Sequence, residues 1–211
     1  MSALPRRALL LTVLAIAGCS GERGAPSGPK ESFDPLSYDY LNPIRLNVAS
    51  VEVETRIAPP SSGQDMTMLD PVQPAAAITR MAHDRLQALG PSGRAVLVIN
   101  DATIVRRGDD YEGSFAVELD IYTSANVRAA FAEARASGKR SVSSDETTQR
   151  ALYELTKTLM DQLNVELEYQ TRRVMPDWLV AAPAAETPVQ QQDLAPPPGA
   201  TPTAPTTPAT Q

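Results

Sequence analysis

The chain has 211 residues, and its 19 Lys and Arg residues against 25 Asp and Glu residues give a net charge of −6 at pH 7. This length suits one modest domain, and the acidic balance argues against nucleic acid and anionic lipid headgroups as partners. Because the chain has a single cysteine, it cannot form an internal disulfide and must be stabilised by burial of apolar side chains.

Residues 1–18 have the pattern of a secretory signal peptide. Arg6 and Arg7 form a charged start, a predominantly apolar run occupies residues 8–17, and small residues follow. The apolar run is too short to cross a bilayer, which takes roughly 20 residues. The sequence therefore predicts export of the chain and removal of this segment.

The end of the apolar run resembles the lipobox of bacterial lipoproteins, in which an aliphatic residue, a small residue and Gly or Ala precede a cysteine. Ile16, Ala17, Gly18 and Cys19 fill these four positions. The resemblance implies cleavage before Cys19 and lipidation of its side chain. Several acyl chains would hold the protein on a membrane stably, since each buried CH₂ contributes roughly 0.8 kcal/mol. The alternative is an ordinary thiol near a cleavage site.

The residue after the cysteine bears on which membrane would hold the chain. In the enterobacterial version of this family, an Asp at that position favours retention in the inner membrane, and this chain has Ser20. The resemblance therefore implies the periplasmic face of the outer membrane.

Low-complexity segments flank the expected domain, which spans residues 44–180. Residues 19–43 are rich in Gly, Pro and Ser and indicate a flexible tether, although Phe33, Tyr38, Tyr40 and Leu41 could lie against the domain or a partner. Residues 181–211 consist mainly of Pro, Ala, Thr and Gln. We expect this tail to be disordered and partly polyproline II.

The first half of the domain has clear periodicity. Alternation predicts a half-buried strand over residues 49–57, and a stripe of apolar residues predicts a helix from Gln73 to Leu89 that Gly90 and Pro91 end. Residues 94–105 are apolar on both faces and predict a central strand. A turn at residues 108–113 then leads into a strand in which Phe115, Val117, Leu119 and Ile121 face the core.

The segment 126–136 is ambiguous between helix and strand. Its alanines favour a helix, whereas Val127, Ala129 and Phe131 fit one face of a strand that ends at Ser137 and Gly138. We predict a strand, because the short connection from the preceding strand suits a hairpin.

The clearest element is a long helix before Pro176. Ser143 and Glu146 predict a capping box. The residues expected on the buried stripe are Leu152, Leu155, Leu159, Leu163 and Leu167. The residues expected on the outer face are Glu154, Lys157, Asp161, Glu168 and Arg172, with Glu168 paired to Arg172.

The predicted order β-α-β-β-β-α defines an α+β fold, with a small, mostly antiparallel four-stranded sheet and both helices on one face. With the lipobox, this succession over residues 46–172 resembles the lipopolysaccharide-assembly lipoproteins and the auxiliary lipoproteins of envelope ABC transporters. The resemblance rests on the order of the elements and on the cellular location that the lipobox implies. It includes no catalytic or binding motif that could be assigned to residues of this chain.

Few residues suggest chemistry. His83, the single histidine, is expected to be a surface or helix-packing residue, because no serine stands in a nucleophile elbow. The loop 90–94 lacks the ending of a phosphate loop and is interpreted as a connection. Asp109, Asp110 and Glu112 could chelate a cation, but their spacing favours a solvated hairpin tip.

A final group of acidic and polar residues, Asp161, Asn164, Glu166 and Glu168, could attract a basic partner or form a solvated helix face. We predict no catalytic residue, metal site or cofactor, and no enzymatic activity. The favoured function is that of an accessory protein with an envelope protein partner and a membrane anchor at Cys19. The alternatives are a hydrolase of cell wall or envelope lipid, and a carrier of an apolar ligand in a cavity between sheet and helices.

Overall fold

The computed structural model describes residues 31–141 and 143–181. The expected signal peptide, Cys19 and nearly all of the C-terminal tail lie outside these residues. The chain divides into two units after Asp34, and all the helices and strands described below belong to the second unit.

The second unit contains seven strands and two α-helices among its described residues. The strands are β1 (Ile44–Leu46), β2 (Ser50–Thr55), β3 (Gln64–Asp65), β4 (Leu86–Ala88), β5 (Arg94–Arg107), β6 (Asp110–Tyr122) and β7 (Arg128–Ser141). The helices are α1 (Pro74–Arg85) and α2 (Thr148–Val174), with short 3-10 helices at Thr67–Leu69 and Pro176–Trp178.

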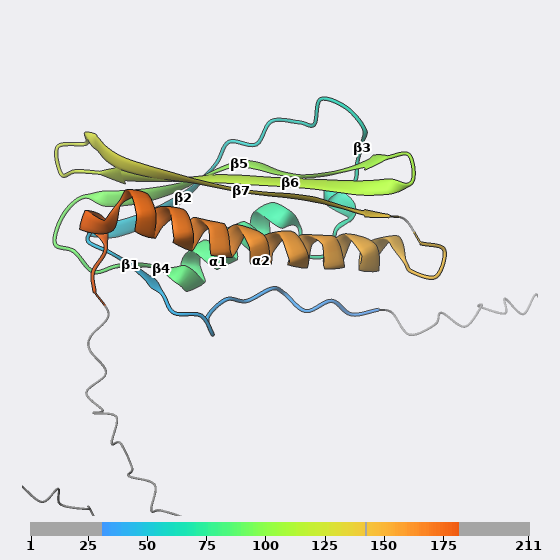
Figure 1. Ribbon diagram of the computed structural model, residues 1–211, viewed down its shortest axis with the longest axis horizontal. Coiled ribbons are helices and arrows are strands. Elements are labelled where there is room, and N and C mark those ends of the chain that lie inside the picture. Colours follow the sequence, from blue (N-terminus) through green and yellow to red (C-terminus); the bar gives the residue numbers. More distant parts are fainter. Residues whose placement is uncertain (1–30, 142, 182–211) are drawn as a thin grey trace, which may run out of the picture. The chain divides into compact units, whose positions relative to one another are not determined.

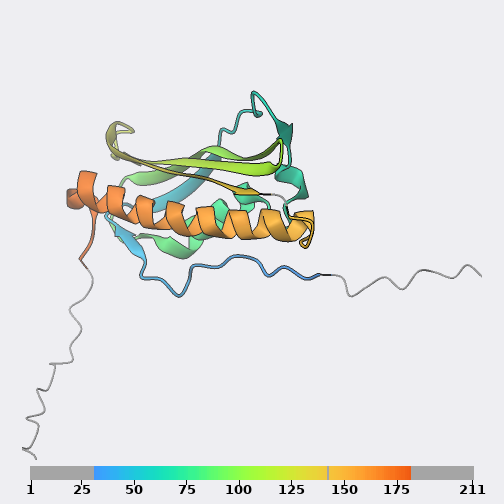
Figure 2. The same ribbon diagram turned by 45° about the vertical axis from the view of Figure 1, so that its right-hand side comes forward.

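The main sheet has five strands in the order β2-β5-β6-β7, with β3 also paired to β5. β2 runs parallel to β5, and the other pairs are antiparallel. Both helices lie on one face of this sheet (Figures 1 and 2). The α+β class is confirmed, but the prediction of a small four-stranded sheet is wrong, because β3 adds a strand and the α1 crossover makes β2 and β5 parallel.

The central strands follow the predicted pattern. Residues 95–99 of β5 are all buried, as expected for a strand apolar on both faces. The alternating core residues of β6, from Phe115 to Ile121, are at most 1% exposed. The turn between β5 and β6 is shorter than predicted, since β6 begins at Asp110 and Gly108 takes a positive φ of 59°.

The ambiguous segment forms a strand, as predicted, but β7 continues past the expected turn at Ser137 and Gly138 to Ser141. The predicted face is wrong, because Val127 is 60% and Phe131 50% exposed. The buried residues are instead Ala132, Ala134 and Ala136, which stand opposite core residues of β6. Their small side chains leave room for α2 against β7.

Helix α1 ends four residues earlier than predicted. Leu86 is buried, but it belongs to β4, which pairs in parallel with β1, and Leu89 is 54% exposed. The periodic apolar pattern therefore extends beyond the helix, because the backbone of residues 86–88 forms hydrogen bonds with β1 in place of helical ones. Gly90 is required at this crossing, since a Cβ there would lie 2.4 Å from the backbone carbon of Asn47.

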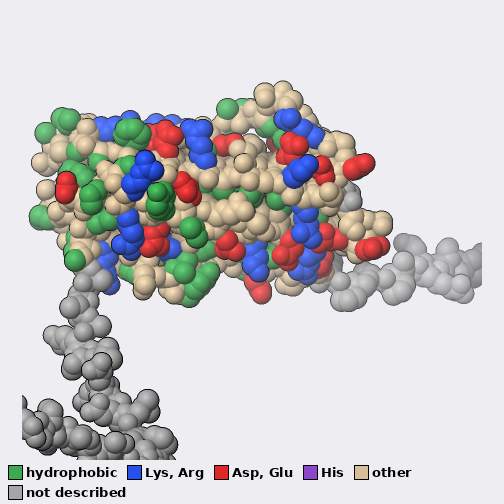
Figure 3. All heavy atoms as spheres, in the orientation of Figure 1, with side chains coloured by type: hydrophobic (Ala, Val, Ile, Leu, Met, Phe, Trp, Pro, Cys, Tyr) green, Lys and Arg blue, Asp and Glu red, His purple; other side chains and the backbone are tan. Residues whose placement is uncertain are grey.

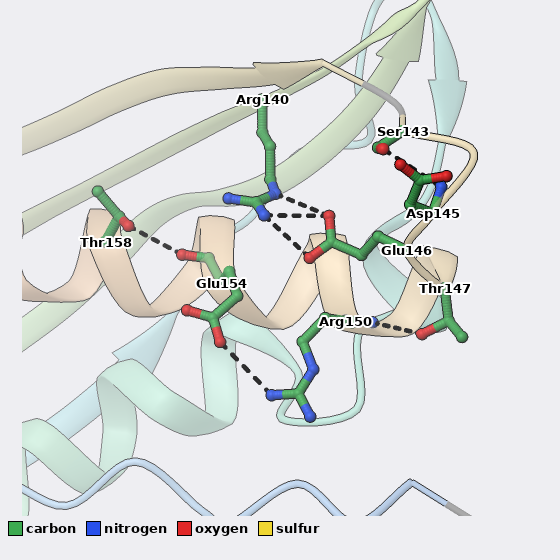
Figure 4. Close-up of polar contacts among 8 residues, drawn as sticks. All are labelled: Arg140, Ser143, Asp145, Glu146, Thr147, Arg150, Glu154 and Thr158. Carbon is green, nitrogen blue, oxygen red and sulfur yellow. Dashed lines mark hydrogen bonds and ion pairs between the residues drawn. The ribbon is translucent and has the colours of Figure 1, made fainter.

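Helix α2 buries all five leucines of the predicted stripe, and it ends before Pro176 as expected. The predicted capping box is wrong. Thr147 caps the helix by accepting a hydrogen bond from the Arg150 N–H at 3.1 Å, as Figure 4 shows. Glu146 instead pairs with Arg140 of β7, because the chain leaves β7 beside that arginine.

The outer face of α2 is as predicted in its charges except at Glu168, whose carboxylate also pairs with the buried Arg85 of α1. Lys157 and Asp161 are exposed, and Glu154 pairs with Arg150 at 3.5 Å. Glu168 pairs with Arg172 at 2.9 Å, one helical turn later. The stripe and the outer face together confirm the amphipathic interpretation of this helix.

The packing of α2 on the sheet is close. A Cβ on Gly113 of β6 would lie 2.4 Å from Cδ1 of Leu159, and one on Gly138 of β7 would lie 3.3 Å from Cδ2. Because both positions are glycine, the Leu159 side chain can lie directly against the backbone of the sheet. Because the leucine occupies this space, the packing at this point does not favour an apolar-ligand cavity between sheet and helix.

The two ends of the domain pack against its core. Tyr38 is 2% exposed, and its backbone N–H donates to the Asp84 carboxylate at 2.8 Å. Burial, and then the charge of Asp161, raise the pKa of Tyr38 well above its usual range. At the other end, Trp178 packs against the core and its carbonyl accepts from the Asn47 N–H at 2.8 Å. Ordered packing therefore begins before Ile44.

Candidate interaction site on the open face of the sheet

The face of the sheet opposite the helices is called here the open face. Neither helix covers it in Figures 1 and 2. Strand register aligns its central side chains in two rows, since residues directly opposite each other in a sheet share a face. One row holds Glu54, Val98, Glu118 and Glu133, and the other holds Glu52, Val96, Asp120 and Phe131.

The centre of the open face is apolar and well covered. Val96 is 3% and Val98 2% exposed, although no helix packs on them. Beside them, the Arg128 guanidinium lies 4.3 Å from the centre of the Phe131 ring. The open face therefore combines a small apolar centre with a charged surround.

Carboxylates and arginines alternate in that surround, since Arg56 pairs with Glu54 at 2.5 Å and Arg135 pairs with Glu133 at 3.0 Å. Arg128 forms ion pairs with Glu118 and with Asp120, the latter at 2.5 Å. Asp120 is 4% exposed, and its Oδ1 atom has this ion pair but no aligned hydrogen bond among the described residues. Burial, and then the neighbouring Asp120, raise the pKa of Glu118. Arg128 thus neutralises charge on two neighbouring carboxylates, and it forms no ion pair with the exposed Glu52.

A hollow of about 450 Å³ extends the open face toward the β5–β6 turn. The segment Pro60–Ser62 forms one wall, and Arg107 donates to Ser62 Oγ at 2.7 Å. Polar side chains from three strands form the floor, namely Thr103, Ser114, Ser137 and Lys139. The open face therefore changes from acidic at its centre to hydroxyl-rich and basic at this end.

The chemistry of the open face suits recognition of a cationic side chain. Carboxylates from neighbouring strands can accept charge-assisted hydrogen bonds from Lys or Arg, which are about twice as strong as neutral ones. Within residues 31–141 and 143–181, no group of three or more His, Cys, Asp or Glu side chains could hold a metal ion. The open face is therefore a candidate surface for a basic segment of another protein.

The residues that the sequence singled out are dispersed. His83 is exposed on α1, as predicted, and neighbouring Asp84 binds the backbone of Tyr38. The loop 90–94 connects β4 to β5, as interpreted. Of these residues only Arg94, the first residue of β5, lies on the open face, where its guanidinium is 4.3 Å from the centre of the Tyr122 ring.

The candidate chelating group at the hairpin is engaged with other side chains. Asp110 accepts from Ser141 Oγ at 2.7 Å and pairs with Lys139, and the hydrogen bond from Ser141 lowers the pKa of Asp110. Glu112 pairs with Arg107 at 3.3 Å. This tip is a set of ion pairs, in agreement with the favoured interpretation of a solvated hairpin end.

The acidic group on α2 contains a structural site that the sequence did not reveal. Arg85, at the end of α1, is 1% exposed and donates to Asn164 Oδ1 at 2.6 Å and to Glu168 Oε2 at 2.5 Å. It also donates to the Asn42 carbonyl at 3.1 Å. Asn164 and Glu168 therefore hold the two helices together. The signal was available, because Arg85 follows Met81 at helical spacing on the buried stripe.

This network has a pH dependence that can be measured. Burial alone would raise the pKa of Glu168, but the hydrogen bonds from Arg85 and Arg172 outweigh it and hold this pKa below its usual range. Stability from Glu168 is therefore fully present above the unfolded-state pKa of about 4.3 and is lost as the pH falls through the lower folded-state pKa.

We expect Glu168→Gln to destabilise the protein at pH 7 and to reduce its loss of stability in acid. Urea unfolding at several pH values checks this, with Glu154→Gln as the control, since Glu154 pairs with the 38% exposed Arg150 whereas Glu168 pairs with the buried Arg85. Equal acid sensitivity of wild type and Glu168→Gln would contradict it.

Comparison with known proteins adds little. No family model matches the sequence, and no curated protein matches it significantly. A minor lipoprotein from Acinetobacter baumannii shares 14% identity and a TM-score of 0.27, over 65% of this chain and 99% of that one. Lipoprotein GNA1162 from Neisseria meningitidis shares 9% identity and a TM-score of 0.25, over 54% and 96%. TM-scores this low carry no argument about function.

Proposed function

We propose that the protein is a lipid-anchored accessory component of a cell-envelope machine and is not an enzyme. It sits on the periplasmic face of the outer membrane, anchored through Cys19. Support for the anchor comes from the lipobox-like residues 16–19. No helix in the described part of the chain is long and apolar enough to cross a membrane.

The open face carries the proposal for partner binding. Val96 and Val98 are buried at its centre, so its accessible groups are the charged ones, and among the described residues the exposed Glu52 forms no ion pair. A basic segment of an envelope protein would complement this charge and gain specificity from it. The machine that this protein serves is one of transport or outer-membrane assembly.

The test is affinity capture of the tagged full-length protein from detergent-solubilised native membranes. Glu52→Lys with Glu54→Lys reverses charge on the open face, and we expect the co-purifying protein to be lost. Glu154→Lys with Asp161→Lys makes the same charge change on α2 and is the matched control. If the α2 variant loses the partner and the open-face variant keeps it, the docking assignment is wrong. Turnover of an envelope substrate by the purified protein would contradict the accessory role itself.

A second prediction concerns the anchor. Cys19→Ala removes the site of lipidation, so we expect the protein to be found as a soluble form or as an uncleaved precursor. Fractionation of cells followed by carbonate extraction of the membranes measures this, with Ser20→Ala as the neighbouring control. Mature Cys19→Ala protein that still resists extraction would contradict the lipid anchor.

A further inference from the structure

Strand β7 has a long unpaired edge. It is 14 residues long, and among the described strands it pairs with β6 and no other. An edge of this length presents a row of N–H and C=O groups that can template pairing with another strand. No proline interrupts β7, so every residue whose backbone points to the free edge keeps an N–H donor there.

The surroundings of this edge are open and partly apolar. A hollow of about 780 Å³ follows residues 129–135, with Glu166, Gln170 and Val174 of α2 on its other side. Val174 is 46% exposed, and Tyr169, one helical turn from Glu166, is 55% exposed. Figure 3 shows hydrophobic side chains gathered over the half of this face where β7 begins and α2 ends.

We propose that the β7 edge pairs with β7 of a second copy of this chain, antiparallel and centred on Ala134. Two identical strands related by a two-fold axis through Ala134 place Glu133 of each copy opposite Arg135 of the other. Both side chains are exposed at the edge, Glu133 to 46% and Arg135 to 74%, and pair with each other within one copy at 3.0 Å. The charges are thus available for exchange between copies.

The same charges select the register. Centring the axis one residue earlier would set Glu133 against Glu133, and centring it one residue later would set Arg135 against Arg135. Like charges directly opposite each other destabilise a strand pair. On the helix side, centring on Ala134 sets Ala132 against Ala136, and these small side chains allow close approach. Of these three adjacent registers only the one centred on Ala134 is self-complementary, which favours a second copy as the occupant.

The pairing goes beyond the proposed function and is compatible with it. A two-fold axis perpendicular to the sheet joins the two five-stranded sheets edge to edge and keeps both open faces on one side. The two α2 helices come together on the opposite side, where they can cover the exposed Tyr169. The pair would then present two acidic open faces in one plane to the envelope partner.

The experiment uses two differently tagged full-length copies, co-expressed and solubilised in mild detergent. Capture of one tag measures the co-purifying amount of the other. We expect wild-type copies to co-purify, and Glu133→Arg or Arg135→Glu alone to reduce self-capture about tenfold or more, because each sets two pairs of like charges across the axis. Co-expression of Glu133→Arg with Arg135→Glu restores both pairs, so the mixed pair should co-purify again.

The controls separate this from folding and from partner binding. Both substitutions are at exposed positions, so thermal melting should be unchanged, and Glu154→Arg on α2 should not affect self-capture. Loss of the envelope partner with Glu52→Lys and Glu54→Lys reports on the open face, whereas self-capture reports on β7. Absence of wild-type co-purification, single variants that still self-associate, or failure of the mixed pair to recover would each overturn the proposal.

Discussion

Replacing Arg85 with alanine is expected to lower the free energy of unfolding by about 3–5 kcal/mol, because removing one partner of a buried pair leaves the other charge uncompensated. Arg85 is 1% exposed and joins Asn164 and Glu168 of α2 to the Asn42 carbonyl. Its loss would leave two polar side chains and a cavity at the junction of both helices.

Urea unfolding of the purified protein measures this loss. The matched control is Arg172→Ala, since Arg172 pairs with the same Glu168 but its side chain is 60% exposed. An exposed pair of this kind contributes about 0–1 kcal/mol. Arg85→Met, which keeps most of the volume without the charge, separates packing from electrostatics. Equal effects of Arg85→Ala and Arg172→Ala would show that the buried network does not stabilise the domain.

Replacing Leu159 with alanine is expected to cost about 2–5 kcal/mol, a large share of the 5–15 kcal/mol that stabilises a typical domain. Leu159 is fully buried, and it contacts the sheet where Gly113 and Gly138 leave space for it. Because glycine offers no side chain to fill the vacated volume, the cavity would not collapse easily. Leu155→Ala, one turn earlier on the stripe, should act in the same direction.

The control for the leucine change is on the same helix. Val165 is 70% exposed, so Val165→Ala should change the free energy of unfolding by no more than about 0.5 kcal/mol. Charge reversal at Lys157 should be similarly neutral. Unfolding in urea is monitored by circular dichroism. The variants are compared with a common slope for the dependence of the free energy of unfolding on urea concentration. A Leu159→Ala loss as small as that of Val165→Ala would mean that α2 is not anchored by its leucine stripe.

Elements with a clear pattern of hydrophobic and polar residues could be predicted from the sequence. The leucine stripe of α2 repeats over five positions, and only a helix with one buried face satisfies that spacing. The run at residues 95–99 is apolar at every position, which a central strand explains. In β7 the contrast is absent, since alanine occurs on both faces, and the larger Phe131 lies on the exposed one. The strand was therefore predicted and its buried face was not.

The candidate sites depended even more on distant contacts. Cys19 could be proposed from four adjacent residues, because a processing motif is read in the unfolded chain. The open face required the register of four strands, which brings Glu54, Glu118 and Glu133 into one row from positions far apart in sequence.

The sequence by itself determined the amphipathic helix and the central strands, and it alone supports the proposed anchor at Cys19, since each depends on neighbouring residues. Only the tertiary structure decided that residues 86–88 leave the helix for β4, that Arg85 is buried against α2, and that β7 keeps a free edge. These outcomes depend on which backbone and side-chain groups meet across long separations. Local propensity carries no information about contacts between residues far apart in the sequence, because the free energy of burial and strand pairing is gained only when the chain has folded.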